Sequence, residues 1–131
     1  MCIAESRIPR VVLTPDTSRR FETIVFETVH LNAGNCFHED HVLFIAPVEG
    51  LYVFSTSLLS ATYDYIQSLL LKNGDEMGRI DCGQSIDYEH CSITVILELQ
   101  EGDEVWIAHK YPPTGQISGY SVSSFTGFLL R

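Results

Sequence analysis

The chain has 131 residues, of which 45% are hydrophobic, enough for one compact domain with a buried core and too few for two. Its 17 acidic and 8 basic residues give a formal net charge of −9, so its field repels polyanions and disfavours nucleic acid as a partner. No apolar run approaches the roughly 20 residues that cross a bilayer, which argues against insertion into a membrane.

The first ten residues, MCIAESRIPR, lack the apolar stretch of a secretory signal, and we interpret them as an N-terminal extension. Residues 11–131 are then a single domain, in which the hydrophobic periodicity is that of strands. A first strand is predicted over residues 21–30, where aromatic and β-branched residues dominate. Further strands are predicted over residues 42–45, 51–59, 65–72, 77–82, 91–99, 104–109 and 123–130.

Turn-forming residues separate these segments, as in PVEG (47–50), NGD (73–75) and GD (102–103). Short strands with such punctuation indicate an all-β sandwich or barrel, and we find no helix, internal repeat or low-complexity segment.

Two predicted strands, LYVFSTSLL (51–59) and SSFTGFLL (123–130), carry apolar residues on both faces. A two-layer sandwich buries one face of each sheet, so the second apolar face needs another partner. We expect that partner to be another copy of the chain; the alternative is that these are central strands with incidental surface hydrophobic residues. The opposed apolar residues are Leu51 and Val53 against Tyr52, Phe54 and Leu58, and Phe125 and Leu129 against Phe128 and Leu130.

Several motifs resemble one family. The segment 44–54 fits its F-x-x-P-x-x-G-x-Y-x-F pattern, residues 73–74 its Asn-Gly hairpin, residues 102–106 its GD-x-VW element and residues 124–128 its S-F-x-G-F strand. Val42 stands where the family usually has glycine. From about residue 21 to 130, the chain resembles the globular head family of complement C1q.

This resemblance implies an all-β, two-sheet, ten-stranded jelly-roll sandwich of the tumour-necrosis-factor type, assembled as a trimer. In such jelly rolls the last strand lies in the middle of the inner sheet, beside the first, and that sheet packs around a threefold axis. We therefore expect loss of the last seven residues to abolish folding, and loss of the first ten to be tolerated. Gly127 should allow a close approach of backbone or ring, and Trp106 should be buried.

Catalysis is not indicated. A nucleophile needs a base within hydrogen-bond reach and an orienting group, and no Ser or Cys lies in a recognisable motif, so we predict that the protein is not an enzyme. The segment His38–His41 (HEDH) lacks the spacing of the His-Glu-x-x-His zinc helix, and we interpret it as a solvated turn.

An acidic loop at residues 81–89 has the carboxylate oxygens that calcium prefers. Relatives in the resembled family hold calcium near the trimer axis with acidic residues of this region, which implies Asp81, Glu89 or Asp87 as ligands here. The alternative is that these are solvated surface carboxylates. Cys82 and Cys91 stand at the two ends of the loop, and we expect a disulfide between them if the compartment is oxidising.

The resemblance implies binding rather than catalysis. The expected function is that of a secreted, trimeric pattern-recognition lectin of innate immunity, which binds glycans or microbial surfaces through avidity. The expected ligand contacts are Asp87, Tyr88, Lys110 and Tyr111, whose aromatic rings and charged groups can stack on and hydrogen-bond a sugar. Two alternatives share the fold: a trimeric signalling ligand for a protein receptor, and the assembly head of a larger extracellular matrix protein. Two alternatives follow for location: either the natural chain starts at Met1 and is intracellular, or it is secreted and a leader, with or without other segments, has been removed from it.

Overall fold

The computed structural model describes residues 2–6, 12–14, 22–25, 28–38, 43–60, 66–82, 89–111, 117–118 and 123–131. Within these residues thirteen strands form two antiparallel sheets, and no helix occurs. Consequently no helix of the described part is long and apolar enough to cross a membrane. The predicted all-β, two-sheet architecture is confirmed, with thirteen strands described in place of the ten expected.

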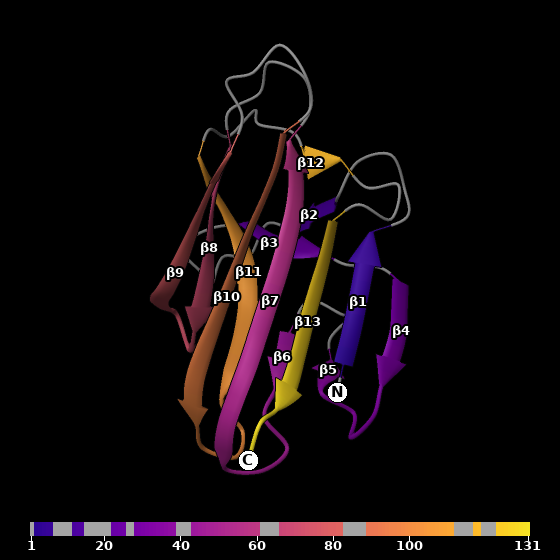
Figure 1. Ribbon diagram of the computed structural model, residues 1–131, viewed down its shortest axis with the longest axis vertical. Helices are drawn as coiled ribbons and strands as arrows, with labels where there is room; N and C mark the ends of the chain where they lie inside the picture. Colours follow the sequence, from indigo (N-terminus) through magenta and orange to yellow (C-terminus); the bar gives the residue numbers. More distant parts are fainter. Residues whose placement is uncertain are drawn as a thin grey trace.

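The first sheet, here called the β7 sheet, has the strand order β10-β7-β13-β1-β4, and the short β12 also pairs with β7. Figure 1 shows these strands side by side, with the yellow β13 between β7 and β1. The last strand thus lies in the middle of the sheet, as the resemblance implied, but its neighbour is β1 and not a strand of residues 21–30, where the first strand was predicted. The strands are β1 (Cys2–Ser6), β4 (Thr28–Asn32), β7 (Gly50–Ser60), β10 (Glu89–Leu99), β12 (Ile117–Ser118) and β13 (Ser123–Leu129).

The second sheet, the β11 sheet, is built around β11. One edge of β11 pairs with β8, which pairs with β9; the other edge pairs with β6 near its start and with β3 near its end. β5 and β2 extend the sheet from β6 and β3. The strands are β2 (Val12–Thr14), β3 (Glu22–Val25), β5 (Phe37–His38), β6 (Leu43–Ile45), β8 (Ile66–Lys72), β9 (Asp75–Cys82) and β11 (Glu104–Tyr111).

Two sequence predictions need correction. Residues 21–30 were predicted as one strand, but they contain β3 in the β11 sheet and the start of β4 in the β7 sheet. The prediction joined them because the apolar pattern continues across the point where the chain changes sheets. Residues 2–6, predicted to belong to a dispensable extension, form β1, in which Cys2 pairs with both Gly127 and Asn32. Removal of β1 would leave β13 and β4 without their shared neighbour, so we now expect this deletion to destabilise the fold.

The other predicted strands agree with β6 to β11 and β13 within two residues at either end. The short strands β2, β5 and β12 were not predicted, because two or three residues carry too little periodicity to register. His38 belongs to β5, whereas the rest of the segment up to His41 lies outside the described residues.

Aromatic rings from both sheets fill the middle of the sandwich. The rings of Phe44 and Phe54 meet edge to face with centroids 4.8 Å apart, and Phe125 stacks on Phe54 at 6.0 Å. A Cβ on Gly127 would lie 2.8 Å from both Phe44 and Phe54, so this glycine makes room for the two rings, as predicted. The Tyr52 hydroxyl donates a hydrogen bond to the carbonyl of Val48 at 2.6 Å, which satisfies the polar atom of a buried ring.

Candidate functional site

The sandwich has two ends with different contents. We call one the apical end: there β7, β9 and β11 finish, and β8 and β10 begin (Figure 1). The opposite, basal end holds the β8–β9 hairpin, the start of β7 and the end of β13.

The predicted ligand residues that the structure describes lie at the apical end. Lys110 and Tyr111 are the last residues of β11. The backbone of Tyr111 pairs with Gln67 on β8, which pairs with Asp81 on β9, so a predicted ligand residue and a predicted metal ligand lie two strands apart in one row. Asp87 and Tyr88 lie outside the described residues.

The predicted calcium ligands come from different sheets. Asp81 is exposed near the end of β9, where its Oδ2 accepts a hydrogen bond from Nε of Arg79 at 3.1 Å. Glu89 begins β10 in the β7 sheet, opposite Ser60. In the part of the chain that the structure describes, no three His, Cys, Asp or Glu side chains are grouped to hold a metal. The Arg79 guanidinium already binds Oδ2 of Asp81, so a cation at that oxygen would compete with it.

Among the described side chains, Cys36 and Cys91 are each disulfide-bonded, and no cysteine there is free. Cys82 is the last residue of β9, and its side chain is not among those that the structure describes. The pairing of Cys82 with Cys91 therefore stays a prediction.

The face of the β7 sheet that points away from the β11 sheet, here called the open face, is apolar toward the basal end. The strand register places Ile96 and Phe128 on either side of Val53 in one row. Ile96 is 59% exposed, and Val53 and Phe128 are half-buried, whereas Tyr52 and Phe54 on the opposite face are buried. Leu130, at the basal end, is 51% exposed, whereas Leu129, 44% exposed, pairs with Tyr52 and lies on the core side of β13. The doubly apolar character of β7 and β13, predicted from the sequence, is confirmed.

Toward the apical end the open face carries hydroxyl groups instead. Two rows of three cross the sheet, and within one of them Ser55 Oγ and Thr94 Oγ1 are 3.2 Å apart. Ser57, a member of the other row, also places its Oγ 3.1 Å from Nδ1 of His90. Among the described residues no carboxylate hydrogen-bonds this imidazole. Sequence reasoning missed these contacts, since they depend on strand register. The rows are Ser92, Ser57 and Ser124, and Thr94, Ser55 and Thr126.

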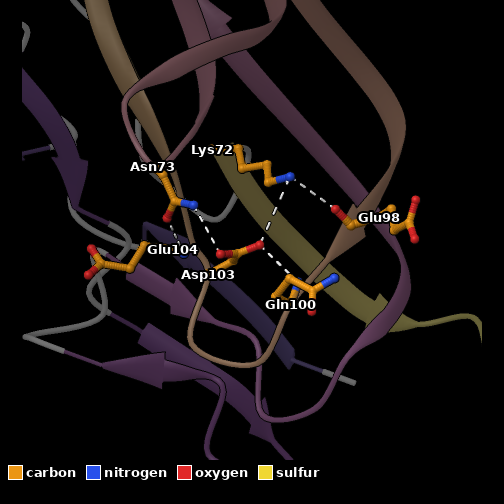
Figure 2. A network of polar contacts seen from close by, with 6 residues as sticks. All are labelled: Lys72, Asn73, Glu98, Gln100, Asp103 and Glu104. Atoms are coloured by element: carbon orange, nitrogen blue, oxygen red, sulfur yellow. Dashed lines mark hydrogen bonds and ion pairs between the residues drawn. The ribbon is translucent and has the colours of Figure 1, made fainter.

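At the basal end a polar network, here called the turn bracket, joins two turns (Figure 2). Nδ2 of Asn73 in the β8–β9 turn donates to Oδ1 of Asp103 at 3.0 Å, and Oδ1 of Asn73 accepts from the backbone nitrogen of Glu104 at 2.9 Å. Oδ2 of Asp103 accepts from the backbone nitrogen of Gln100 at 2.8 Å. Lys72 Nζ lies 4.0 Å from the same Oδ2. Asp103 therefore connects the β8–β9 turn to the β10–β11 turn.

These contacts lower the pKa of Asp103 below its ordinary value, chiefly through the hydrogen bond from the Gln100 backbone and next through Asn73. Because the pKa of Asp103 is lower in the folded than in the unfolded state, its ionised form stabilises the fold at pH values above the unfolded-state pKa of about 3.9. This stabilisation is lost as the pH falls through the lower pKa of the folded state. We expect Asp103→Ala to lower the free energy of unfolding by about 1–3 kcal/mol at neutral pH. Urea titrations should show the gap to wild type closing in acid, with Glu101→Ala, an exposed carboxylate in the same turn, as control. A gap that is independent of pH would contradict the role of the carboxylate.

Comparison with known proteins identifies the family. The family model of the C1q domain matches residues 11–130. The chain belongs to the C1q-domain family. Among curated relatives of this C1q domain, the heavy metal-binding protein HIP of Mytilus edulis is 32% identical over 109 residues, which are 81% of this chain and 51% of HIP. Complement C1q tumor necrosis factor-related protein 2 of Mus musculus is 28% identical over 123 residues, which are 92% of this chain and 42% of the relative.

Solved structures confirm the jelly-roll fold of this C1q domain. The globular domain of zebrafish complement 1qA superposes with a TM-score of 0.78 at 17% identity, covering 99% of this chain and 96% of that one. Eiger TNF from S. frugiperda superposes with a TM-score of 0.71 at 9% identity, covering 99% and 91%. The C1q domain spans about half or less of the curated relatives that it matches, so the activities of those whole proteins do not transfer directly.

Proposed function

We propose that the chain is a trimeric extracellular recognition module that binds repeated glycans or microbial surface patterns. The observation that carries the proposal is the open face of the β7 sheet, where Ile96, Val53 and Phe128 form an apolar row that the chain itself leaves accessible. Contiguous exposed apolar surface marks an interaction site in soluble proteins. Membership of the C1q-domain family supports a second and third copy of the chain as the occupants of this face.

Self-association is tested by placing a charge in the apolar row. We expect wild type to sediment with about three times the monomer mass of 14.7 kDa, and Ile96→Lys to sediment as a monomer. Met77→Lys is the matched control, because Met77 is 42% exposed but lies on β9 in the other sheet. A monomeric wild type, or a variant at Ile96 that remains trimeric, would refute this interface.

Recognition is assigned to the apical end, with Asp87, Tyr88, Lys110 and Tyr111 as the contacts. Lys110 and Tyr111 end β11 at the end opposite the apolar row, so self-association through that row would not cover this end of the strand. A trimer would then present three weak sites whose combined affinity exceeds that of one.

A glycan array tests the ligand class. We expect wild type to bind clustered glycans, Tyr111→Ala to lose binding while staying trimeric, and monomeric Ile96→Lys to lose binding to the array through loss of avidity. An array with no glycan bound would reject the lectin function and leave the two alternatives, a signalling ligand or the assembly head of a larger matrix protein.

Calcium is proposed to link binding and assembly through Asp81, Glu89 and Asp87. A divalent cation would offset the repulsion between acidic loops of a trimer whose subunits each carry −9. The name of HIP, a heavy metal-binding protein, gives this proposal support from a relative. Chelation should lower the melting temperature of wild type and leave that of Asp81→Asn plus Glu89→Gln unchanged. Identical melting curves for wild type with calcium and with chelator would reject the metal.

Secretion completes the proposal. The disulfide-bonded state of Cys36 and Cys91 supports it, because disulfides persist mainly in oxidising compartments.

A further inference from the structure

The β8–β9 turn holds the one Asn-Gly pair of the sequence, Asn73–Gly74. Both residues have positive φ, 51° and 94°, as a two-residue hairpin turn of type I′ requires. Asn-Gly is also the dipeptide in which asparagine most readily loses its amide, because no side chain on glycine shields the following backbone nitrogen. That nitrogen attacks Cγ of asparagine and expels ammonia to close a succinimide, which water then opens to aspartate or isoaspartate. One water is consumed and one ammonia released, with no redox partner.

The turn bracket holds the amide of Asn73 away from this reaction. Nδ2 is bound to Asp103 at 3.0 Å and Oδ1 to the backbone nitrogen of Glu104 at 2.9 Å (Figure 2). The backbone nitrogen of Asn73 is also bound, to the carbonyl of Glu104 at 2.8 Å. For Gly74 to attack, the side chain must turn back over its own following peptide, and it can do so only after leaving Asp103 and Glu104. Asn73 is exposed, so water reaches it once it is free.

We propose that Asn73 is a site of spontaneous deamidation, that the turn bracket sets its rate, and that the product opens the bracket. Aspartate at this position puts a carboxylate oxygen where Nδ2 now donates, 3.0 Å from Oδ1 of Asp103. A donor is lost and two like charges face each other at contact distance. Isoaspartate additionally lengthens the backbone of a two-residue turn whose strands are paired directly at Lys72 and Asp75.

The rate is tested by incubating the folded protein in mildly alkaline buffer and mapping the peptide Asn73–Arg79 for the mass gain of amide-to-carboxyl conversion. We expect Asp103→Ala to accelerate conversion about tenfold, the factor that corresponds to one or two lost hydrogen bonds. Glu101→Ala is the control, because it removes an exposed carboxylate from the same turn as Asp103 and leaves the Asn73–Asp103 hydrogen bond and the cleavage site at Lys72 intact, so it should react at the wild-type rate. Equal rates in wild type and Asp103→Ala would overturn the proposal. Equally fast deamidation of Asn35 in Asp103→Ala would also overturn the proposal, because Asn35 is an exposed asparagine in another turn and its acceleration would indicate general unfolding.

The consequence is tested separately by thermal melting of Asn73→Asp and wild type across pH. Aspartate suits a type I′ turn nearly as well as asparagine, so the comparison isolates the new charge. We expect Asn73→Asp to melt below wild type at neutral pH, and the difference to narrow in acid, where the facing carboxyls are protonated. An Asn73→Asp protein as stable as wild type at neutral pH would overturn the claim that the product opens the bracket.

Discussion

Replacing Trp106 by alanine is expected to lower the free energy of unfolding by about 3–5 kcal/mol and to remove most of the soluble protein. Trp106 is 4% exposed on β11, as predicted from the sequence. It lies outside the aromatic core, in a second buried cluster on the other face of the β11 sheet, with Leu43, Leu69, Leu71 and Ala108. Alanine would leave a cavity among these buried side chains.

Soluble yield, urea unfolding and tryptophan fluorescence measure this effect. Trp106→Phe is the matched control, because it keeps most of the buried ring and should retain most of the stability. An alanine variant that folds normally, together with wild-type emission of a solvated indole, would contradict the burial of this ring.

Replacing Gly127 by valine is expected to prevent folding, and replacing it by alanine to cost about 1–3 kcal/mol. A Cβ at this position would lie 2.8 Å from Phe44 and Phe54, which real Cβ atoms essentially never show, and both rings are locked in the aromatic core. β13 would have to move away from these rings, although it is held between β7 and β1.

Thermal melting of Gly127→Ala measures the cost, with Thr126→Val as control on the adjacent, half-buried position of the same strand. Thr126 points to the open face, so its substitution should leave stability within the small range of surface changes. An alanine variant at Gly127 that melts with wild type would show that the rings can give way.

Local patterns accounted for much of the fold. The alternation in residues 51–59 predicted both a strand and the side on which each residue lies, and Tyr52 and Phe54 are indeed buried while Leu51 and Val53 are half-buried. The Asn-Gly pair predicted the turn at residues 73–74, because few other residues accept its positive φ values. For the candidate site the sequence placed Lys110 and Tyr111 near the end of a strand, but it could not show their neighbours.

The sequence by itself determined the all-β class, most strand positions, the two apolar faces of β7 and β13, the burial of Trp106 and the close approach of rings at Gly127. These follow from side-chain alternation and backbone preferences, which act between residues close together in the chain. The tertiary structure alone decided that residues 22–32 divide between two sheets, that β1 lies between β13 and β4, and that Asp103 binds Asn73. It also brought Ser57 to His90. Each of these depends on which strands pair and in what register, and that choice is made by contacts between residues far apart in the sequence, for which no local pattern carries a signal.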